Sequence, residues 1–422
     1  MDGQFLYLSI ETWKYLSMPV ISAVVGYVTN VVAIKMMFHP IEFVGVYKPF
    51  LGWQGIVPRK ASKMAGIAVD TITESLITEA EIFSRLDPDR VARELEEPMA
   101  ELADEITDTV LQRNHPGLWE AMPSLMREQI RRRVRSRAPG LVREIMAGVQ
   151  TNVRYMFDLK GMITRSLVRE KNLLNRIFLE TGRAEFRFIG RSGAYFGFLF
   201  GLVQMLIWVF FEAWWLLPLF GLLVGWATNW LALKMIFNPK NAIRIGPFTI
   251  QGLFFKRQKE VSADYGRLVA TQLMTPQHIF EEILNGPYAE KLFALVQREV
   301  QQAIDSSTRL ARPFMSWTLG HRDYDNIKTE AVREVVARMP DTLSHVTDYA
   351  HDAMAIRETL ITRLQRLTPR QFEGMLRPAF EEDEWILIAV GAALGLAVGW
   401  FQLIVLFSDV FIDRFGALPW FG

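Results

Sequence analysis

The sequence has no cysteine, only six histidines among 422 residues, and a net charge of +1. Without cysteine the chain has neither disulfides nor thiolate metal ligands, and the histidines show no metal-ligand spacing. Neither a Gly-x-Ser-x-Gly sequence, nor a phosphate loop, nor a His-Glu-x-x-His motif occurs. A net charge near zero gives no argument for nucleic-acid binding. We therefore expect no metal, no cofactor, no nucleic-acid partner and no enzymatic activity.

Apolar residues make up 50% of the chain and are concentrated in four long runs. Each run approaches or exceeds the ~20 residues that a helix needs to cross a bilayer. The runs are residues 18–38, 194–211, 214–237 and 385–407. Lys35 and Lys234 are the formal charges inside them, and each lies near an end, where a long side chain can snorkel. The sequence therefore predicts a multi-span membrane protein with four transmembrane helices.

An aromatic, amphipathic lead occupies residues 1–17, before the first run. It carries two acids and a single lysine, so it lacks the basic n-region of a signal peptide. Helical periodicity then dominates two long segments between the apolar runs, residues 39–193 and 238–384, in which no alternating strand pattern is evident. We expect each segment to form an extramembrane helical domain.

Two motifs occur twice along the chain. Residues 26–40 and 225–239 share Gly, Thr-Asn, Ala, Lys-Met, Phe and Pro at the same offsets, 199 residues apart. The second motif is a row of glycines at four-residue spacing that ends near a glutamine: Gly193, Gly197, Gly201 and Gln204, and again Gly391, Gly395, Gly399 and Gln402. Such a row allows close helix packing. We interpret the chain as a tandem duplication with repeat units of about 15–212 and 213–412, here called the first and second halves, related by a pseudo-twofold axis along the membrane normal.

The fold class expected is therefore an all-α integral membrane protein, with four transmembrane helices, an internal repeat and two extramembrane helical domains. Cations flank the apolar runs on one side: Lys48, Arg59, Lys60 and Lys63; Arg183, Arg187 and Arg191; and Lys240, Arg244, Lys256 and Arg257. The short 212–215 connection has neither lysine nor arginine. The positive-inside rule then places the helical domains in the cytoplasm and the termini on the periplasmic or extracellular side.

The repeated Gly-Tyr/Trp-x-Thr-Asn-x-x-Ala-x-Lys-Met-x-Phe-x-Pro start, the following Gln-Gly-x-x-Pro-Arg-Lys and the closing glycine-rich helix resemble a known family. It is domain-of-unknown-function family 445, the YheB/YjiN-like bacterial membrane proteins. Both halves carry the start and the end, but the second half departs from the pattern at residues 253–256. The resemblance implies a bacterial inner-membrane protein and implies no established reaction.

Six polar side chains lie within the predicted spans: Thr29, Asn30, Gln204, Thr228, Asn229 and Gln402. At 1.5 Å per residue, Asn30 lies ~12 Å from the end of its span, and Gln204 is expected at a similar depth or slightly higher. The four amides would then meet near the pseudo-axis. They are either interhelical hydrogen-bond partners, at ~1 kcal/mol per bond, or the wall of a hydrated path or substrate site.

The cations in and beside the predicted spans, and those of a basic run farther along the chain, each allow two interpretations. Lys35 and Lys234 are snorkelling anchors or counter-ions for a ligand. Arg59-Lys60 and Lys256-Arg257 close loops of apolar residues that suggest an interfacial segment, so they either bind anionic lipid headgroups or only set topology. The basic run 127–137 is either a solvated face paired within the chain, for example with the acidic segment 94–105, or a site for an anionic partner.

The leading hypothesis for function is a non-enzymatic inner-membrane scaffold or lipid-interacting envelope protein, whose partners are membrane lipids with anionic headgroups. The alternative is a small-solute or ion transporter or channel with a polar path between the halves. Four spans offer little wall for such a path. Dimerisation could supply more, so a homo-oligomer is kept as a second partner hypothesis.

Overall fold

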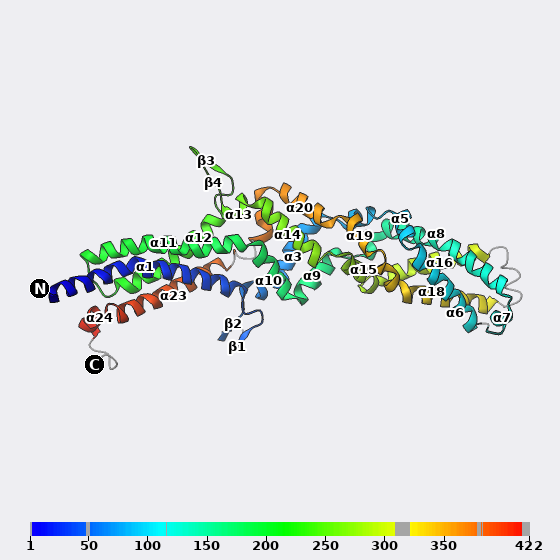
Figure 1. Cartoon of the computed structure of the whole chain (residues 1–422), viewed down its shortest axis with the longest axis horizontal. Helices are drawn as coiled ribbons and strands as arrows, with labels where there is room; N and C mark the ends of the chain where they lie inside the picture. Colours follow the sequence, from blue (N-terminus) through cyan, green and yellow to red (C-terminus); the bar gives the residue numbers. More distant parts are fainter. Residues whose placement is uncertain are drawn as a thin grey trace. The chain divides into compact units, whose positions relative to one another are not determined.

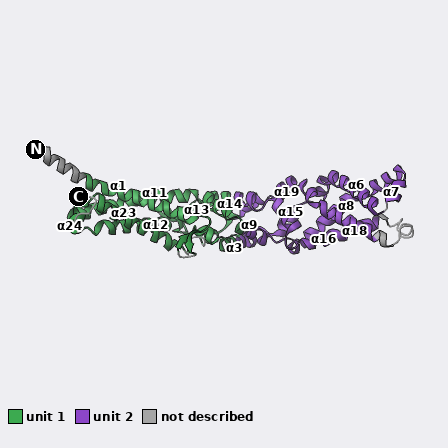
Figure 2. Ribbon diagram, turned by 90° about the horizontal axis from the view of Figure 1, so that it is seen from below, with its two compact units in different colours: residues 1–68, 167–265, 364–422 green, residues 69–166, 266–363 purple. Residues whose placement is uncertain are grey.

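The computed structural model describes residues 2–47, 51–114, 116–308, 321–377, 381 and 383–415. Nearly all of the described chain is helical (Figure 1). It forms two compact units (Figure 2): unit 1 contains Met1–Ala68, Leu167–Tyr265 and Leu364–Gly422, and unit 2 contains Val69–Ser166 and Gly266–Arg363. Each unit therefore takes segments from both halves of the sequence.

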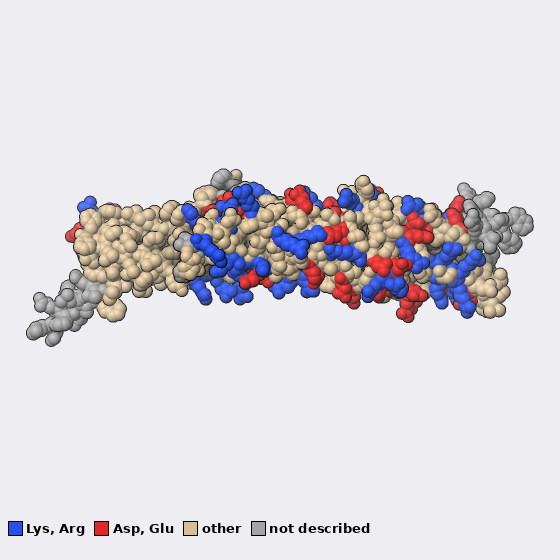
Figure 3. All heavy atoms as spheres, turned by 90° about the horizontal axis from the view of Figure 1, so that it is seen from above, with Lys and Arg blue, Asp and Glu red and all other residues tan. Residues whose placement is uncertain are grey.

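Unit 1 holds four long apolar helices. They are α1 (Asp2–Phe38), α11 (Arg183–Phe210), α12 (Leu216–Phe237) and α23 (Glu384–Val405). All four have the length and composition to cross a membrane. On the face shown in Figure 3, the surface over these helices is almost free of charged side chains, and lysines and arginines gather directly beyond it. The predicted all-α membrane fold with four apolar spans is confirmed.

The span helices pack in two pairs, α1 with α11 and α12 with α23. Helix α12 also contacts α1 and α11, which joins the pairs. A short helix, α24 (Ser408–Phe415), follows the last span. The helices extend beyond the predicted runs: the lead 1–17 is continuous with the first span from residue 2, and α11 begins at Arg183 rather than at residue 194.

Two short antiparallel hairpins follow the first and third spans, at equivalent places in the two halves. Strands β1 (Val44–Tyr47) and β2 (Leu51–Trp53) pair in one, and β3 (Ile243–Ile245) and β4 (Phe248–Ile250) pair in the other. The sequence analysis expected no strands. That expectation is wrong here because strands of three or four residues are too short for alternation to be visible.

The remaining helices of unit 1 are short. They are α2 (Ile56–Arg59), α10 (Lys171–Thr181), α13 (Leu253–Lys256) and α21 (Pro369–Leu376). Four more helices contribute residues to both units: α3 (Ala61–Thr71), α9 (Leu159–Arg169), α14 (Gln258–Gln272) and α20 (Ile356–Arg366).

Unit 2 is a bundle of helices from both halves. The first half contributes the π-helix η1 (Ile72–Leu76), α4 (Glu79–Ser84), α5 (Pro88–Glu94), α6 (Glu96–Asn114), α7 (Pro116–Ala121) and α8 (Ser124–Met156). The second contributes α15 (Pro276–Asn285), α16 (Ala289–Thr308), α18 (His321–Ser344) and α19 (Thr347–Met354). Helix α8 packs on α16, and α6 packs on α18. The central parts of the two segments expected as separate helical domains, residues 69–166 and 266–363, thus pack on each other in one compact unit, and the outer parts of both segments belong to unit 1.

Candidate functional site

The two span asparagines make the same hydrogen bond in each half. The Asn30 side-chain amide donates to the carbonyl of Ile189 at 2.7 Å, and the Asn229 amide donates to the carbonyl of Leu387 at 3.0 Å. Both side chains are buried. These bonds tie α1 to α11 and α12 to α23, which is the helix-packing role considered from the sequence.

The threonines that precede the asparagines bond back to their own helices. The Thr29 hydroxyl donates to the Gly26 carbonyl at 3.3 Å, and the Thr228 hydroxyl lies 2.7 Å from the Val224 carbonyl. Thr228 also lies 3.5 Å from the side-chain oxygen of Asn30, which belongs to the other helix pair. The polar residues of the two halves therefore meet at Asn30 and Thr228.

The two glutamines do not join this contact. The Ser22 hydroxyl donates to the Gln204 side-chain oxygen at 3.0 Å. Ser22 precedes Asn30 by eight residues on α1, so Gln204 lies ~12 Å farther along that helix than Asn30. The expected meeting of four amides is therefore not formed, because the glycine contacts set a different register between α1 and α11. The amide nitrogens of Gln204 and Gln402 are buried and find no acceptor within the described chain.

The glycine rows place the paired helices in backbone contact. A Cβ atom on Gly193 would lie 2.2 Å from the Gly26 carbonyl oxygen, and one on Gly197 would lie 2.3 Å from that of Ser22. In the second half, a Cβ on Gly391 would lie 2.0 Å from the Asn229 amide nitrogen. Equally close contacts face Gly201, Gly395 and Gly399. The close packing expected from the four-residue spacing is confirmed.

Three of the four loop cations form ion pairs with carboxylates of the opposite half. Arg257 lies 2.7 Å from Glu185, which is buried near the start of α11. Arg59 and Lys60 lie 3.5 and 2.8 Å from Asp383, which is buried just before α23. Protein carboxylates therefore neutralise Arg59, Lys60 and Arg257, and the expected lipid headgroups are not needed as their partners.

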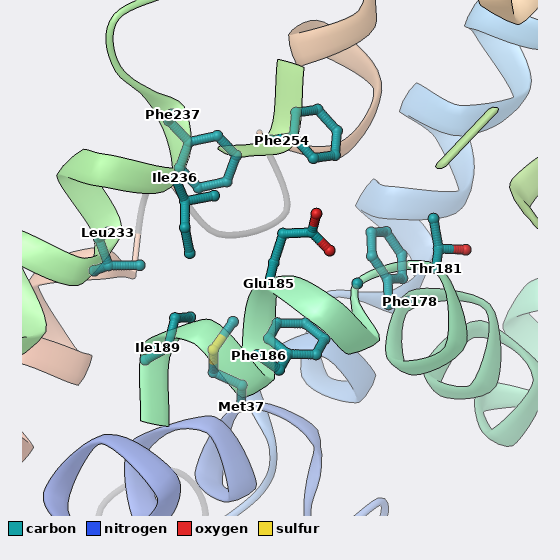
Figure 4. A pocket seen from close by; sticks show the side chains of 11 residues that line it. Met37, Phe178, Thr181, Glu185, Phe186, Ile189, Leu233, Ile236, Phe237 and Phe254 are labelled. Carbon is teal, nitrogen blue, oxygen red and sulfur yellow. The ribbon is translucent and has the colours of Figure 1, made fainter. Parts of the chain in front are cut away.

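A cavity of about 50 Å³ lies beside Glu185. In Figure 4 the Glu185 carboxylate points from α11 toward Phe254, with Thr181 next to Phe178 at the far edge. One carboxylate oxygen of Glu185 and the hydroxyl of Thr181 are buried without a hydrogen-bond partner in the described chain. The cavity is large enough for a water molecule, but its accessible wall is apolar.

The remaining predicted cations are exposed. Lys35 is on the outer face of α1, and Lys256 is on α13. The Lys234 ammonium lies 4.6 Å from the centre of the Trp230 ring, a cation–π contact.

Three further cations lie at the start of α11. Arg183, Arg187 and Arg191 are exposed and recur every four residues along the first turns of α11. They line a groove of about 430 Å³ together with apolar residues of α1. Four-residue spacing of arginines was the available sequence signal, but the groove beside them depends on how α1 packs.

Ion pairs and burial shift the pKa values of three groups outside the spans. Burial lowers the pKa of Arg257, but Glu185 and Glu260 outweigh it, so the pKa is raised overall. Burial raises the pKa of Glu373, but Lys240 and Arg377 outweigh it, so the pKa lies below its ordinary value. Burial alone raises the pKa of the Tyr265 hydroxyl.

The basic run of α8 is paired within unit 2. Arg131 forms a two-pronged ion pair with Asp108 at 2.9 Å, and Arg135 pairs with Asp104. Arg132 pairs with Glu128 one turn away. The interpretation of residues 127–137 as a face paired within the chain is therefore confirmed for these three arginines. Within the described ranges no group of His, Asp and Glu side chains is arranged to hold a metal ion.

Comparison with known proteins supports the family resemblance. Residues 20–152 match the model of a family described as "Protein of unknown function (DUF445)". A UPF0754 membrane protein of Bacillus cereus (strain AH187) is 31% identical over 119 residues, 28% of this chain and 31% of that protein. One of Bacillus mycoides (strain KBAB4) is 33% identical over 110 residues, 25% of this chain and 29% of that protein.

The matched stretch thus spans about three tenths of these relatives' length. No solved structure matches this chain. The predicted resemblance to family 445 is confirmed over residues 20–152, and this chain, like the relatives, is a membrane protein.

Proposed function

This membrane protein matches, over residues 20–152, a family without a known function, and we propose that it is a non-enzymatic scaffold that interacts with anionic lipids. We further propose that it resides in a bacterial inner membrane. The helical unit 2 would lie on the cytoplasmic side, and the termini would lie on the other side. This orientation rests on the flanking cations of the spans.

The scaffold proposal rests on the buried polar groups of the spans, which hydrogen-bond to neighbouring helices. Asn30 and Asn229 donate to backbone carbonyls of the neighbouring helix, and the glycine rows leave no room between the paired backbones. In hydrocarbon such hydrogen bonds and small-residue contacts are what hold helices together. Polar groups engaged in this way favour a rigid four-helix core over a hydrated path.

The lipid part of the proposal is supported by the surface around the span ends. Lys35, Lys234 and Lys256 are exposed there. The two hairpins present apolar side chains to the outside, including Val46 and Ile243. Apolar side chains with cations beside them suit the boundary between headgroups and acyl chains, where each cation adds about 1 kcal/mol of attraction to an anionic surface.

A second candidate, a transporter or channel, is favoured by a different observation. Glu185, Thr181, Gln204 and Gln402 each have a buried polar atom without a partner in the described chain. Such atoms are unusual unless water or a ligand reaches them. These groups, rather than the asparagines, would then line the path.

Cysteine accessibility separates the two candidates, since the natural chain has no cysteine. Single cysteines at Asn30, Gln204 and Thr181 are treated with a membrane-impermeant thiol reagent, in intact cells and in inverted vesicles. The scaffold proposal expects no labelling at any of them. Labelling at Gln204 and Thr181 would give the transport candidate the lead.

Two further sites control for orientation. Ala213, in the short connection between the second and third spans, is expected to label in intact cells. Ser136, on an exposed face of α8, is expected to label only after the membrane is opened. The reverse pattern would overturn the proposed orientation without deciding between scaffold and transporter.

A further inference from the structure

Three arginines, Arg183, Arg187 and Arg191, lie on one face of α11 and are here called the ladder. Arg183, Arg187 and Arg191 are exposed, and eight residues of helix place the first and last ~12 Å apart. Within the described chain none of them forms an ion pair. The Arg187 Nε–H donates a hydrogen bond to the Arg183 carbonyl, at 3.4 Å.

This lack of partners distinguishes the ladder from two other arginines near the spans, Arg59 and Arg257. Arg59 and Arg257 each pair with a buried carboxylate. Arginine stays charged at every physiological pH, and its planar fork matches the oxygens of a phosphate group. A ladder of unneutralised guanidinium groups beside an apolar span therefore presents a strong site for an anion.

The ladder borders an apolar groove that continues along the first span. The groove has a volume of about 430 Å³ and is lined on its apolar side by Tyr27, Val31, Ile34, Leu179 and Phe186. Tyr27 and Val31 are exposed, as lipid-facing residues are. At Gly190, where no side chain fills the space, a Cβ would lie 3.3 Å from a Val31 methyl group. The groove thus joins cationic and apolar surfaces at one span end.

The corresponding surface of the second half is different. The positions equivalent to the three arginines hold Glu381, Trp385 and Ala389. Those equivalent to Tyr27 and Val31 hold Trp226 and Trp230, whose rings stack with centres 5.9 Å apart. The cavity there is about 180 Å³, and Arg377 at its edge pairs with Glu373. The ladder and open groove are therefore features of the first half.

We propose that the groove of Arg183, Arg187, Arg191, Tyr27 and Val31 binds one anionic phospholipid. The lipid phosphate lies among the guanidinium groups, and an acyl chain follows the apolar groove along α1. Basic pockets between membrane helices are known to hold anionic headgroups. The apolar wall favours a lipid over a free phosphate ion. This inference rests on the proposed lipid interaction and assigns it a specific site.

The test uses the full-length chain, delipidated in a non-ionic detergent. Dioleoylphosphatidylglycerol is titrated in, and bound lipid is counted by native mass spectrometry against dioleoylphosphatidylcholine. We expect the natural protein to retain one phosphatidylglycerol at concentrations where phosphatidylcholine is lost. Arg183→Ala, Arg187→Ala and Arg191→Ala together should weaken this binding at least tenfold.

Two matched variants keep the test specific. Arg176→Ala, Lys259→Ala and Arg366→Ala remove the same charge from exposed positions that do not line the groove, and should weaken binding less than twofold. Val31→Trp introduces the residue of the second half, fills the groove and changes no charge. This variant should also release the lipid. Residue 31 is exposed, so its surroundings can accommodate the larger ring.

The outcomes separate the site from the wider proposal. Equal losses in both triple variants, or no loss in Val31→Trp, would overturn the groove site while the general preference for anionic lipids stands. No preference for phosphatidylglycerol in the natural protein would overturn both. Full competition by inorganic phosphate would show that the ladder binds a soluble anion, and the lipid assignment would fail.

Discussion

The Arg257 guanidinium of the second half lies 2.7 Å from the Glu185 carboxylate of the first half. The reverse pair exists as well: Arg59 of the first half lies 3.5 Å from Asp383 of the second. The two arginines are 198 residues apart, and so are the two acids. Each half therefore supplies the cation for the other's buried acid, which links the loop after one span to the start of a span in the opposite half.

This exchange predicts a large effect when one partner is removed. Arg257→Ala leaves Glu185 buried without its cation, and breaking such a pair costs roughly 3 kcal/mol. We expect a clearly lower melting temperature in detergent, measured by the loss of monodisperse protein after heating. Glu185→Gln in the same chain should recover part of the loss, because it removes the unpaired charge.

The neighbouring residue provides the control. Lys256 is exposed and has no ion pair within the described chain, so Lys256→Ala removes the same charge at little cost. Equal destabilisation by Arg257→Ala and Lys256→Ala would mean that loop charge, rather than the buried pair, matters for stability.

The span pairs predict a second set of effects. In Gly193→Ala, the new methyl group would lie 2.2 Å from the Gly26 carbonyl oxygen, which is far too close for two non-bonded atoms. The helices must separate, which weakens the Asn30–Ile189 hydrogen bond as well, and overpacking of this kind costs about 1–3 kcal/mol. Heating in detergent should show this loss.

Gly66 offers the matched glycine. It lies inside α3, and a Cβ there would have no neighbour within 4 Å. Gly66→Ala should stabilise the protein by about 0.5–1 kcal/mol, since alanine loses less backbone freedom in a helix. If Gly193→Ala were no more destabilising than Gly66→Ala, the contact between α1 and α11 would be looser than the structure shows.

Features with a local cause could be predicted from the sequence. Hydrophobic length revealed the four spans, and four-residue spacing revealed the glycine contact faces. The Thr-Asn motif marked polar residues inside the spans, and the two asparagines among them bond to the neighbouring helix. Each of these signals is contained within a single helix, so no knowledge of the partner helix is needed to read it.

Features that depend on register or on distant partners could not be predicted. Gln204 lies opposite Ser22 rather than near Asn30 because glycine contacts, not span boundaries, align α11 on α1. The loop cations form ion pairs with carboxylates of the opposite half, Glu185 and Asp383. No local pattern specifies such a crossing, and the same holds for the joining of both helical segments in unit 2.

A pH dependence follows from Glu373. Its pKa lies below the ordinary value of 4.5, because Lys240 and Arg377 together outweigh the effect of burial. A depressed pKa adds stability that is present above the unfolded-state pKa and is lost as pH falls through the lower folded-state pKa. The melting temperature should therefore decline as the pH is lowered from about 5 toward 3.

Glu373→Gln identifies the source of this decline. The variant should be less stable than the natural protein near neutral pH, because Lys240 and Arg377 lose their charged partner. The gap should narrow in acid, where the natural carboxylate is protonated as well. A gap that stays constant across the titration would assign the loss to packing instead of charge.

The hairpins predict contact with the membrane surface. Val46 is 93% exposed at the end of β1, and Tyr47 beside it is 64% exposed. Leaving such side chains in water is unfavourable, by about 25 cal/mol per Å² of apolar surface, and the hairpin directly follows a span. We expect a fluorophore attached at Val46→Cys to shift its emission to the blue when the protein enters phosphatidylglycerol-containing vesicles. The same fluorophore at Ser136→Cys, on unit 2, should not shift. A hairpin in water would give equal spectra at both sites, and the apolar side chains would then have to be covered by a protein partner.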